Sequence, residues 1–287
     1  YPSGKMLELD YNQLEIVGQA WLSGDENLTQ DIKNAVDMHC RRVSTKFGIS
    51  YEDAVYWCKD ESAPEHHLWK NRRTGAKAFS FQRAFGAGAT KIAEGTGMSV
   101  QEVQDMILAE EALYPRIPEY NAKVAKAVQD TAYPFRDPNM GGRVFRKGVY
   151  IAPTGTRYTF RSWDAPDYLK KRGIQDTFKS TEMKNYPVQG TSGELVQLVL
   201  GKLFRMFLQK NNYGGKAVLV NTVHDCVWAD VSQEVLLEVA QDMKRVMESI
   251  PEYIQETYNL PCHVPFRVQA EAGDNLYNKE HLTIGAS

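Results

Sequence analysis

The chain has 287 residues, 43% of them hydrophobic and 24% charged, with a formal net charge of −2. This length predicts one large domain or two smaller ones, and the composition excludes a disordered or collagen-like chain. No apolar run approaches the length of a membrane span, and the four cysteines contain no CxxC pair, so neither a membrane anchor, a zinc finger nor a disulfide framework is indicated.

Charge is unevenly placed along the chain. Residues 70–93 hold six lysines or arginines and no acid, so nothing nearby in the sequence neutralises them. A second acid-free stretch, residues 138–163, contains five cations: Arg143, Arg146, Lys147, Arg157 and Arg161. Because local basic surface attracts anions whatever the net charge, both stretches predict contact with an anionic partner.

The first predicted element is a short strand over residues 6–10, which ends in Asp10 and leads into a helix beginning within residues 11–15. A carboxylate at the end of a strand is held on rigid scaffold and can present a metal ligand. The same residue type is also a common helix N-cap. The strand alone does not decide between these two roles.

A helix with two cations and two aromatic rings on one face is predicted over residues 72–86. Arg73, Lys77, Phe81 and Phe85 recur every four residues, a spacing that places them on one slowly turning face. A nucleoside triphosphate would suit this face, since its phosphates attract cations and its sugar and base pack on rings. The alternative is an amphipathic helix whose phenylalanines lie in the core and whose cations are solvated.

Helical and β-rich segments alternate over the rest of the chain. We expect helices over residues 37–48, 98–111, 119–131 and 193–208, with a capping box at Ser99 and Glu102 and a helix end at Gly48. Polar residues 60–70 are typical of a loop, and residues 132–163 of a basic hairpin region. Near the end, we expect strands over residues 217–223 and 227–230 with Asp225 at the turn, a helix capped by Ser232, and a last strand over residues 264–270.

In this order, these features resemble the three motifs of family A DNA polymerases, the DNA polymerase I family, which includes many phage enzymes. The motif A pattern DYxQxE is present at residues 10–15, and the motif B pattern R-x3-K-x3-F-x3-[YF]-G at residues 73–86. The motif C pair of histidine and aspartate is His224 and Asp225. Further matches lie at residues 37–39, at 185 with 189–191, and at 264–265 with 273–275, so the resemblance spans essentially the whole chain.

The resemblance implies an α+β fold, the right-hand polymerase architecture. An antiparallel palm sheet with helices is expected from residues 1–20 and 181–287. Mainly helical fingers are expected from residues 21–180, including the motif B helix and the basic hairpin region. Since the chain begins at Tyr1 rather than at methionine, the thumb and exonuclease of the family are expected upstream, in cis or on a separate chain. A cytoplasmic location is expected, that of the bacterial host for a phage enzyme, with no membrane partner.

The resemblance also implies the chemistry, the addition of a dNTP to a primer 3′-hydroxyl on template DNA by a two-metal mechanism. Asp10 and Asp225 would be the catalytic carboxylates and, with the Tyr11 carbonyl, would bind two Mg²⁺ ions, or Mn²⁺ in their place. The residues expected at the nucleotide are Arg73, Lys77, Phe81, His39, Glu15, Gln13 and Phe85. Those expected to contact primer-template DNA are Asn185, Gln189 and His224.

Three positions depart from the family pattern: Cys226 stands where glutamate is usual, Phe85 where tyrosine is commoner, and Val17 where arginine is usual. A neutral thiol cannot replace the charge of a carboxylate, so a third metal-site acid is not carried over to this chain. Two alternatives stay open, a non-catalytic nucleic-acid-binding remnant and a metal-dependent phosphodiesterase. Retention of Asp10 and Asp225 argues against the first, and the absence of other clustered acid and histidine ligands argues against the second.

Overall fold

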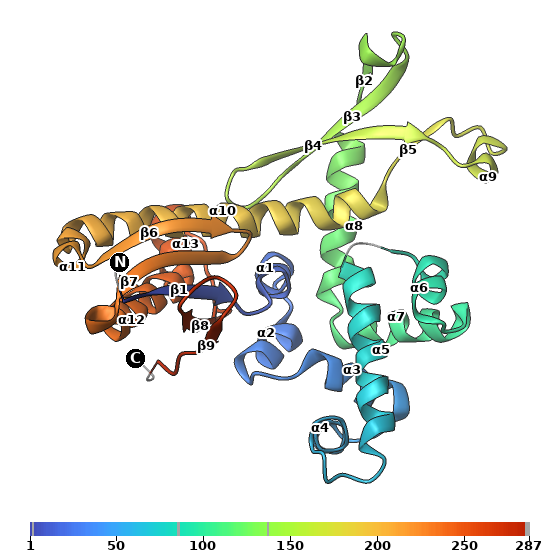
Figure 1. The fold of residues 1–287 in the computed structure, drawn as a ribbon. Helices are drawn as coiled ribbons and strands as arrows, with labels where there is room; N and C mark the ends of the chain where they lie inside the picture. The colour runs from blue at the N-terminus through green and yellow to red at the C-terminus, as the bar shows by residue number, and fades with distance from the viewer. Residues whose placement is uncertain (2, 85–86, 137, 285–287) are drawn as a thin grey trace. The chain divides into compact units, whose positions relative to one another are not determined.

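The structure, a computed structural model, describes residues 1, 3–84, 87–136 and 138–284, with the backbone only for Phe81, Ala84 and Met140. The chain divides into two compact units, one of Tyr1–Trp21 with Val188–Ser287 and the other of Leu22–Pro187. Figure 1 labels the elements of both. None of the described helices combines the length and the apolar character needed to span a lipid bilayer.

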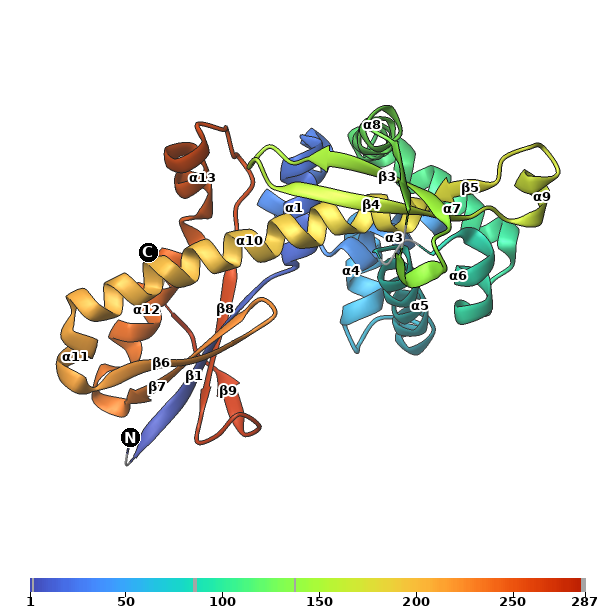
Figure 2. The ribbon, with the colours of Figure 1, turned by 90° about the horizontal axis from the view of Figure 1, so that it is seen from above.

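The first unit is built on an antiparallel sheet of five strands in the order β6-β7-β1-β8-β9 (Figure 2). These strands are β1 (Gly4–Tyr11), β6 (Ala217–Val223), β7 (Cys226–Ser232), β8 (Val268–Gly273) and β9 (Lys279–His281). The central strand β1 pairs with β7 from Gly4 to Asp10 and with β8 from Met6 to Tyr11. The first strand of the chain therefore lies between two strands from its last quarter.

The two faces of β1 have different surroundings, because successive side chains of a strand point to opposite faces. Leu7 and Leu9 are fully buried, and Tyr11, on the same face, donates a hydrogen bond from its hydroxyl to the Met247 carbonyl at 2.7 Å. Met247 belongs to α12 (Leu236–Glu248), so this helix covers the apolar face. Asp10 lies on the opposite face of the sheet.

The remaining helices that enter the first unit are α1 (Leu14–Ser23), α10 (Ser180–Gln209), α11 (Asn211–Gly215), α13 (Ile250–Tyr258) and the short 3₁₀ helix η2 (Gln233–Val235). Helices α1 and α10 approach each other at Gly18. A Cβ atom on Gly18 would lie 2.4 Å from the Ser192 hydroxyl oxygen, so a larger residue there would have to displace the Ser192 side chain.

The second unit is mainly helical. Its helices are α2 (Glu26–Lys33), α3 (Met38–Phe47), α4 (Tyr51–Lys59), α5 (His66–Ala84), α6 (Ala89–Thr96), α7 (Val100–Leu113), α8 (Arg116–Asp130), α9 (Asp167–Lys170) and the 3₁₀ helix η1 (Pro138–Met140). Helix α5 is shared between two apolar clusters: Ala76 packs with α3 and α4 residues, and Phe79 packs with α6 and α7 residues. Neighbouring residues of α5 therefore connect the two apolar clusters of this unit.

A second antiparallel sheet belongs to the same unit, with the strands β2 (Tyr133–Arg136), β3 (Val144–Ile151), β4 (Arg157–Asp164) and β5 (Asp176–Phe178) in sequence order. Helix α8 packs against β3 on one face of this sheet (Figure 1). The basic hairpin region expected from sequence is thus the β3–β4 hairpin with a strand on either side.

Two helices begin earlier than the sequence predicts. Helix α5 starts at His66, inside the predicted loop 60–70, because Trp69 packs against Trp57 with ring centroids 4.7 Å apart and draws this polar segment into the fold. Helix α10 starts at Ser180 rather than Gly193 and continues through Pro187. Proline removes one helical hydrogen bond, yet the buried side chains of Met183 and Val188 show apolar packing on both sides of it.

Two predictions made from local capping signals are confirmed, whereas two predictions made for the last part of the chain are wrong. The Ser99–Glu102 capping box is present, and Gly48 ends α3 in a left-handed conformation with φ 63°. Ser232 does not cap the long helix α12: it is the last residue of β7, pairs with Gly4 and precedes the 3₁₀ helix η2 without a side-chain capping hydrogen bond, and α12 begins only after Val235. The last long strand begins at Val268 rather than at residue 264, since pairing with β1 begins there.

Candidate active site

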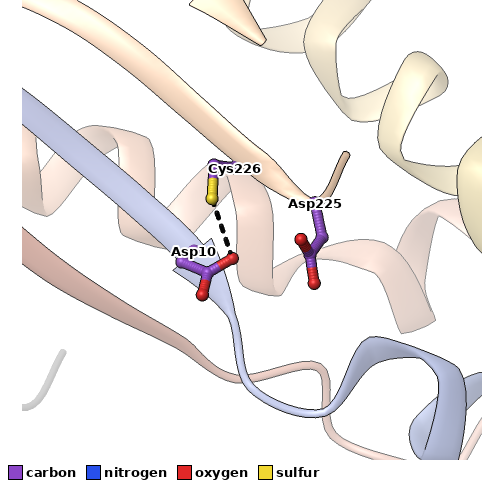
Figure 3. Close-up of side chains that lie close together, drawn as sticks. All are labelled: Asp10, Asp225 and Cys226. Atoms are coloured by element: carbon purple, nitrogen blue, oxygen red, sulfur yellow. Dashed lines mark hydrogen bonds between the residues drawn. The ribbon is translucent and has the colours of Figure 1, made fainter. Parts of the chain in front are cut away.

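Two acids from opposite ends of the chain meet where β1 ends and β7 begins. Asp10 pairs across the sheet with Cys226, and the Tyr11 amide donates to the Asp225 carbonyl at 3.4 Å. The ligand atoms of Asp10, Asp225 and Cys226 all lie within 4.8 Å of one another, and Figure 3 shows the three side chains converging from the two strands. The β6–β7 turn is tight, with His224 at φ 55°, and it presents Asp225 toward Asp10.

The two acids and the thiol affect one another's protonation. The pKa of Asp10 is raised, first by burial and then by the charge of Asp225, while a hydrogen bond from the Cys226 thiol to Asp10 at 3.1 Å acts in the opposite direction. Burial, followed by this hydrogen bond, raises the pKa of the Cys226 thiol to about 12. The thiol is therefore protonated at neutral pH and serves Asp10 as a donor.

The donor set fits a hard divalent cation. Mg²⁺ prefers carboxylate and carbonyl oxygens, and Asp10 and Asp225 offer four such oxygens in one place. A cation between them would remove the repulsion that raises the pKa of Asp10. Because Mg²⁺ has little affinity for a protonated thiol, Cys226 is not part of this oxygen set.

A further acid acts on this site from the neighbouring strand. Glu271 of β8 contributes to raising the pKa values of both Asp10 and Cys226, and its carboxylate pairs with Lys279 at 3.2 Å. Sequence reasoning did not select Glu271. The signal was present in the alternation of β8: Val268 and Ala270 are buried, whereas Gln269 and Glu271 pair with Asp10 and Glu8 and face the side of the sheet that carries Asp10.

Tyr11 contributes to the candidate site through its backbone, whose amide is bonded to the Asp225 carbonyl. Its ring is in the core and its hydroxyl is bonded to Met247, so burial raises its pKa and the side chain is not available to a ligand. Next along the chain, Gln13 is exposed with φ 54° at the start of α1.

Glu15 and Gln189, predicted to contact nucleotide and DNA respectively, are in direct contact. The Gln189 side-chain amide donates to the Glu15 carboxylate at 3.1 Å, which joins the first turn of α1 to α10. Asn185 lies one helical turn before Gln189 on α10, and His224 is exposed at the β6–β7 turn. Motif A and the predicted minor-groove residues are thus linked by one hydrogen bond.

The second unit holds the motif B cations, and its structure corrects one expectation about them. Arg73 is paired with Asp37 at 2.8 Å, and Arg83 is paired with Glu111 at 2.7 Å, so these cations of the acid-free stretch are neutralised from other helices. Lys77 is exposed and makes no ion pair with any described residue. The sequence of residues 70–93 shows the excess of positive charge, but it does not show which acids on other helices pair with it.

Asp37 is the centre of this group, a role that sequence reasoning missed. One carboxylate oxygen caps α3 by accepting from the amides of His39 and Cys40, each at 3.0 Å. The other accepts from Arg73 and from Lys59, each at 2.8 Å. Burial alone would raise the pKa of Asp37, but these bonds hold it far below its usual value. Its capping signal is visible in the sequence, whereas its cationic partners are not.

His39 is neutral in this group. Burial, and then the nearby charge of Arg42, lower its pKa to about 4. Its Nδ1 lies 3.2 Å from the Ser80 oxygen, and the Ser80 hydroxyl donates to the Ala76 carbonyl at 2.6 Å. Since the one hydroxyl proton is used there, Ser80 accepts from His39 Nδ1–H, which leaves Nε2 as an acceptor.

The aromatic half of motif B is described only in part. Phe79 is fully buried in the α5–α6–α7 cluster, as the amphipathic alternative predicted for such rings. Phe81 lies on α5 by its backbone, and Phe85 lies outside the described residues.

Several known proteins are similar to this chain in sequence or in fold. Residues 2–278 match the sequence model of DNA polymerase family A. DNA polymerase I of Caldicellulosiruptor bescii is 24% identical over 95% of this chain and 26% of its own length. The thermostable DNA polymerase I of Thermus aquaticus is 25% identical over 94% of this chain and 27% of its own length. For the DNA polymerase of Bacillus phage SP01 the identity is 25%, over 98% of this chain and 27% of the phage protein.

The chain spans about a quarter of the length of these relatives. Among solved structures, the POL domain of Pol1 from M. smegmatis, in complex with DNA primer-template and dNTP, superposes with a TM-score of 0.62. It is 19% identical, and the match covers 94% of this chain and 39% of that one, a likeness of fold. With two motif acids brought together on the expected antiparallel sheet and a family match over nearly its whole length, the chain belongs to DNA polymerase family A.

Proposed function

We propose that the chain is the palm and fingers portion of a template-directed DNA polymerase that adds dNTPs to a primer 3′-hydroxyl. In this proposal residues 1–20 and 181–287 form the palm and residues 21–180 the fingers. The observation that carries it is the convergence of Asp10 and Asp225, with ligand atoms within 4.8 Å across the β1–β7 pair. Two-metal nucleotidyl transfer uses such a pair of carboxylates, and both residues lie within the range 2–278 that matches the family model.

Asp10 and Asp225 would hold two Mg²⁺ ions, with Mn²⁺ as a substitute and the Tyr11 carbonyl as a further ligand. When bound, these ions would activate the 3′-hydroxyl and stabilise the leaving pyrophosphate. The residues keep the acids in place: the Cys226 thiol holds one Asp10 oxygen at 3.1 Å, and the Tyr11 amide ties the turn that carries Asp225.

Arg73, Lys77 and His39 would bind the triphosphate. Arg73 is oriented by Asp37, which keeps its guanidinium in one position before nucleotide arrives. Lys77, exposed and without an ion pair among the described residues, is the cation most available to phosphate. Phe81, Phe85 and Gln13 would be further nucleotide-binding residues.

Glu15 and Gln189 would act as a pair at the sugar and the minor groove. Their hydrogen bond at 3.1 Å joins the two side chains. In this proposal Glu15 would lie near the 2′ position of the incoming sugar, and Gln189 would contact DNA together with Asn185 and His224. Minor-groove acceptors are similar for all base pairs, so such contacts test the shape of a pair rather than its sequence.

The test is primer extension with Mg²⁺ and dNTPs, on this chain and on a longer protein containing it. Since the chain spans about a quarter of its relatives, we propose that thumb and exonuclease portions, in cis or as a separate chain, complete the enzyme. Asp10→Ala and Asp225→Ala are each expected to lower extension at least about a hundredfold, because each removes a shared metal ligand. The control is Asp130→Ala, an exposed acid that pairs with Lys126 at 2.5 Å.

Two other outcomes would replace this proposal. Binding of primer-template without extension by the completed protein would indicate a non-catalytic nucleic-acid-binding remnant. Cleavage of labelled DNA that depends on Asp10 and Asp225, with no extension, would indicate a phosphodiesterase.

A further inference from the structure

A loop between β4 and β5 carries three consecutive cations. Residues 165–175, which we call the α9 loop, contain Lys170, Lys171 and Arg172, and Asp167 is the one acid among them. All four of these residues are exposed. In both views the loop lies beyond the ends of its two strands (Figures 1 and 2). The loop is therefore a strongly basic projection from the sheet of the second unit.

The backbone of the α9 loop is ordered by its own hydrogen bonds. Its two ends are joined by the Ala165 amide, which donates to the Gln175 carbonyl at 3.0 Å. Within the loop, α9 supplies one helical turn, and the chain leaves this turn at Gly173 with φ 84°, a left-handed conformation that favours glycine. The Ile174 amide then donates back to the Leu169 carbonyl at 3.1 Å. Because the loop already holds one shape, binding a ligand there would cost little ordering of the backbone.

The three cations are not neutralised by other side chains. Lys170, Lys171 and Arg172 make no ion pair with any residue in the described ranges. Asp167 is not within ion-pair distance of any of them, although it lies four residues before Lys171. The acids that end β4 and begin β5 are paired with arginines outside the loop. Consecutive like charges repel one another, and a polyanion would remove this repulsion.

An aromatic ring lies beside these cations and is not covered by them. Tyr168 is 63% exposed, and its ring has no aromatic or cation–π contact with any described residue. Lys171 follows it by three residues in a right-handed helical conformation, so the ring and this cation lie on the same side of the turn. Ile174 is also exposed, at 44%. The loop thus offers free apolar surface and free positive charge together.

We propose that the α9 loop binds single-stranded DNA. Phosphates lie against Lys170, Lys171 and Arg172, and an unpaired base stacks on Tyr168. A polyanion suits three cations in a row, because each phosphate that is neutralised releases a counterion. A single strand suits the open ring, since a duplex keeps its bases stacked inside and offers only phosphates. Membership of a DNA polymerase family favours DNA over other polyanions.

The salt dependence of binding tests the role of the three cations. A labelled oligo-dT of about 12 nucleotides, a length within the range of single-strand sites, is titrated by fluorescence anisotropy across salt concentrations without dNTP or metal. The Lys170→Gln, Lys171→Gln, Arg172→Gln triple variant is expected to lower the slope of log affinity against log salt by about 2, since each phosphate contact with a single strand contributes about 0.7. A matched control, expected to leave the slope nearly unchanged, removes the same charge from exposed positions of α6 and α8: Lys91→Gln, Lys123→Gln and Lys126→Gln.

Substitutions of Tyr168 test stacking apart from charge, with a blunt duplex of equal length titrated in parallel. Tyr168→Ser is expected to lower single-strand affinity at least about fivefold and to leave duplex affinity within about twofold, because only unpaired bases reach the ring. Tyr168→Phe keeps the ring and is the control, expected to stay within about twofold for both DNA forms. Circular dichroism melting shows that each variant is folded, as expected for changes in an exposed loop.

Limited proteolysis of the unmodified protein localises the contact without any substitution. Trypsin cleaves after lysine and arginine, so bound oligo-dT is expected to slow cleavage within the α9 loop, and the blunt duplex is not. The proposal is overturned if the loop triple variant keeps the wild-type salt slope, or if the control triple changes the slope equally. It is also overturned if Tyr168→Ser weakens both DNA forms alike, or if saturating oligo-dT leaves cleavage of the loop unchanged. None of the loop residues has a part in the proposed polymerase site, so a failure of primer extension leaves these readouts unaffected.

Discussion

Arg73 of α5 donates a hydrogen bond to Asp37, the residue that caps α3, with 2.8 Å between guanidinium nitrogen and carboxylate oxygen. One acid therefore caps the start of a helix and orients a motif B cation at the same time. The arrangement links the stability of the second unit to the position of a proposed phosphate ligand.

Asp37→Asn is expected to weaken both properties. Asparagine still caps α3, but it cannot balance the charges of Arg73 and Lys59, so the free energy of unfolding should fall by about 1–2 kcal/mol after allowance for their partial exposure. Urea denaturation measures this loss, and dNTP affinity should fall with it. The control is Glu52→Gln, an exposed acid in the first turn of α4. Equal stability of the two variants would contradict a structural role for the ion pair.

Mild acid is expected to destabilise the protein through His39. Its folded pKa, about 4, is below the ordinary 6.5, so the unfolded chain binds the proton first and stability falls as pH decreases from about 6.5 to about 4. Asp37 acts at lower pH: its depressed pKa gives stability that is present above 3.8 and lost below it. Denaturation of His39→Gln across this range should show a flatter profile between pH 6.5 and 4. An unchanged slope in that variant would assign the effect to other groups.

Nucleotide binding is expected to add a proton to His39. In the free protein Nε2 is an acceptor, since Nδ1–H is directed at Ser80, so His39 can donate to a phosphate only after protonation. An anionic triphosphate would also offset the cations that depress its pKa, which are Arg42, Arg73 and Lys77. Calorimetric titration with dNTP at pH 7.5, in buffers of different ionisation enthalpy, should show proton uptake of up to one equivalent that is absent in His39→Gln. Equal uptake in both proteins would exclude His39 as its source.

Asp10→Asn is expected to separate activity from stability. Extension by the completed enzyme should be lost, because a metal ligand is replaced by a neutral amide. The metal-free protein should melt at the same temperature or higher, since Asp10 is half-buried beside Asp225 and removing one charge relieves their repulsion. Differential scanning calorimetry in EDTA measures this. A clear fall in melting temperature would mean that Asp10 supports the fold directly.

Cys226→Ser is expected to keep most of the activity. The serine hydroxyl can still donate to Asp10, as the thiol does at 3.1 Å, and Mg²⁺ makes little use of sulfur. Extension at saturating Mg²⁺ should stay within about threefold of wild type, whereas Cys226→Ala, which removes the donor, should be the weaker enzyme. Loss of turnover in a folded Cys226→Ser protein would make the thiol a ligand or nucleophile after all.

The sequence by itself determined the local elements that carry the motifs. Alternation of apolar residues placed a strand before Asp10 and a hairpin around Asp225, and the Ser99–Glu102 pair marked the start of α7. Such signals are readable because caps, turns and periodicity act over a few residues. The order of three motifs then indicated the family, which the match over residues 2–278 confirms.

Only the tertiary structure decided how distant residues meet. Asp10 and Cys226 are 216 positions apart, and their contact depends on the register of β1 against β7. The partner of Arg73 is likewise on another helix, and α5 begins at His66 because Trp69 finds Trp57. Burial, sheet register and long-range ion pairs depend on the whole packed chain, so no local pattern contains them. For that reason the sequence could name the candidate acids, while their convergence and electrostatics required the fold.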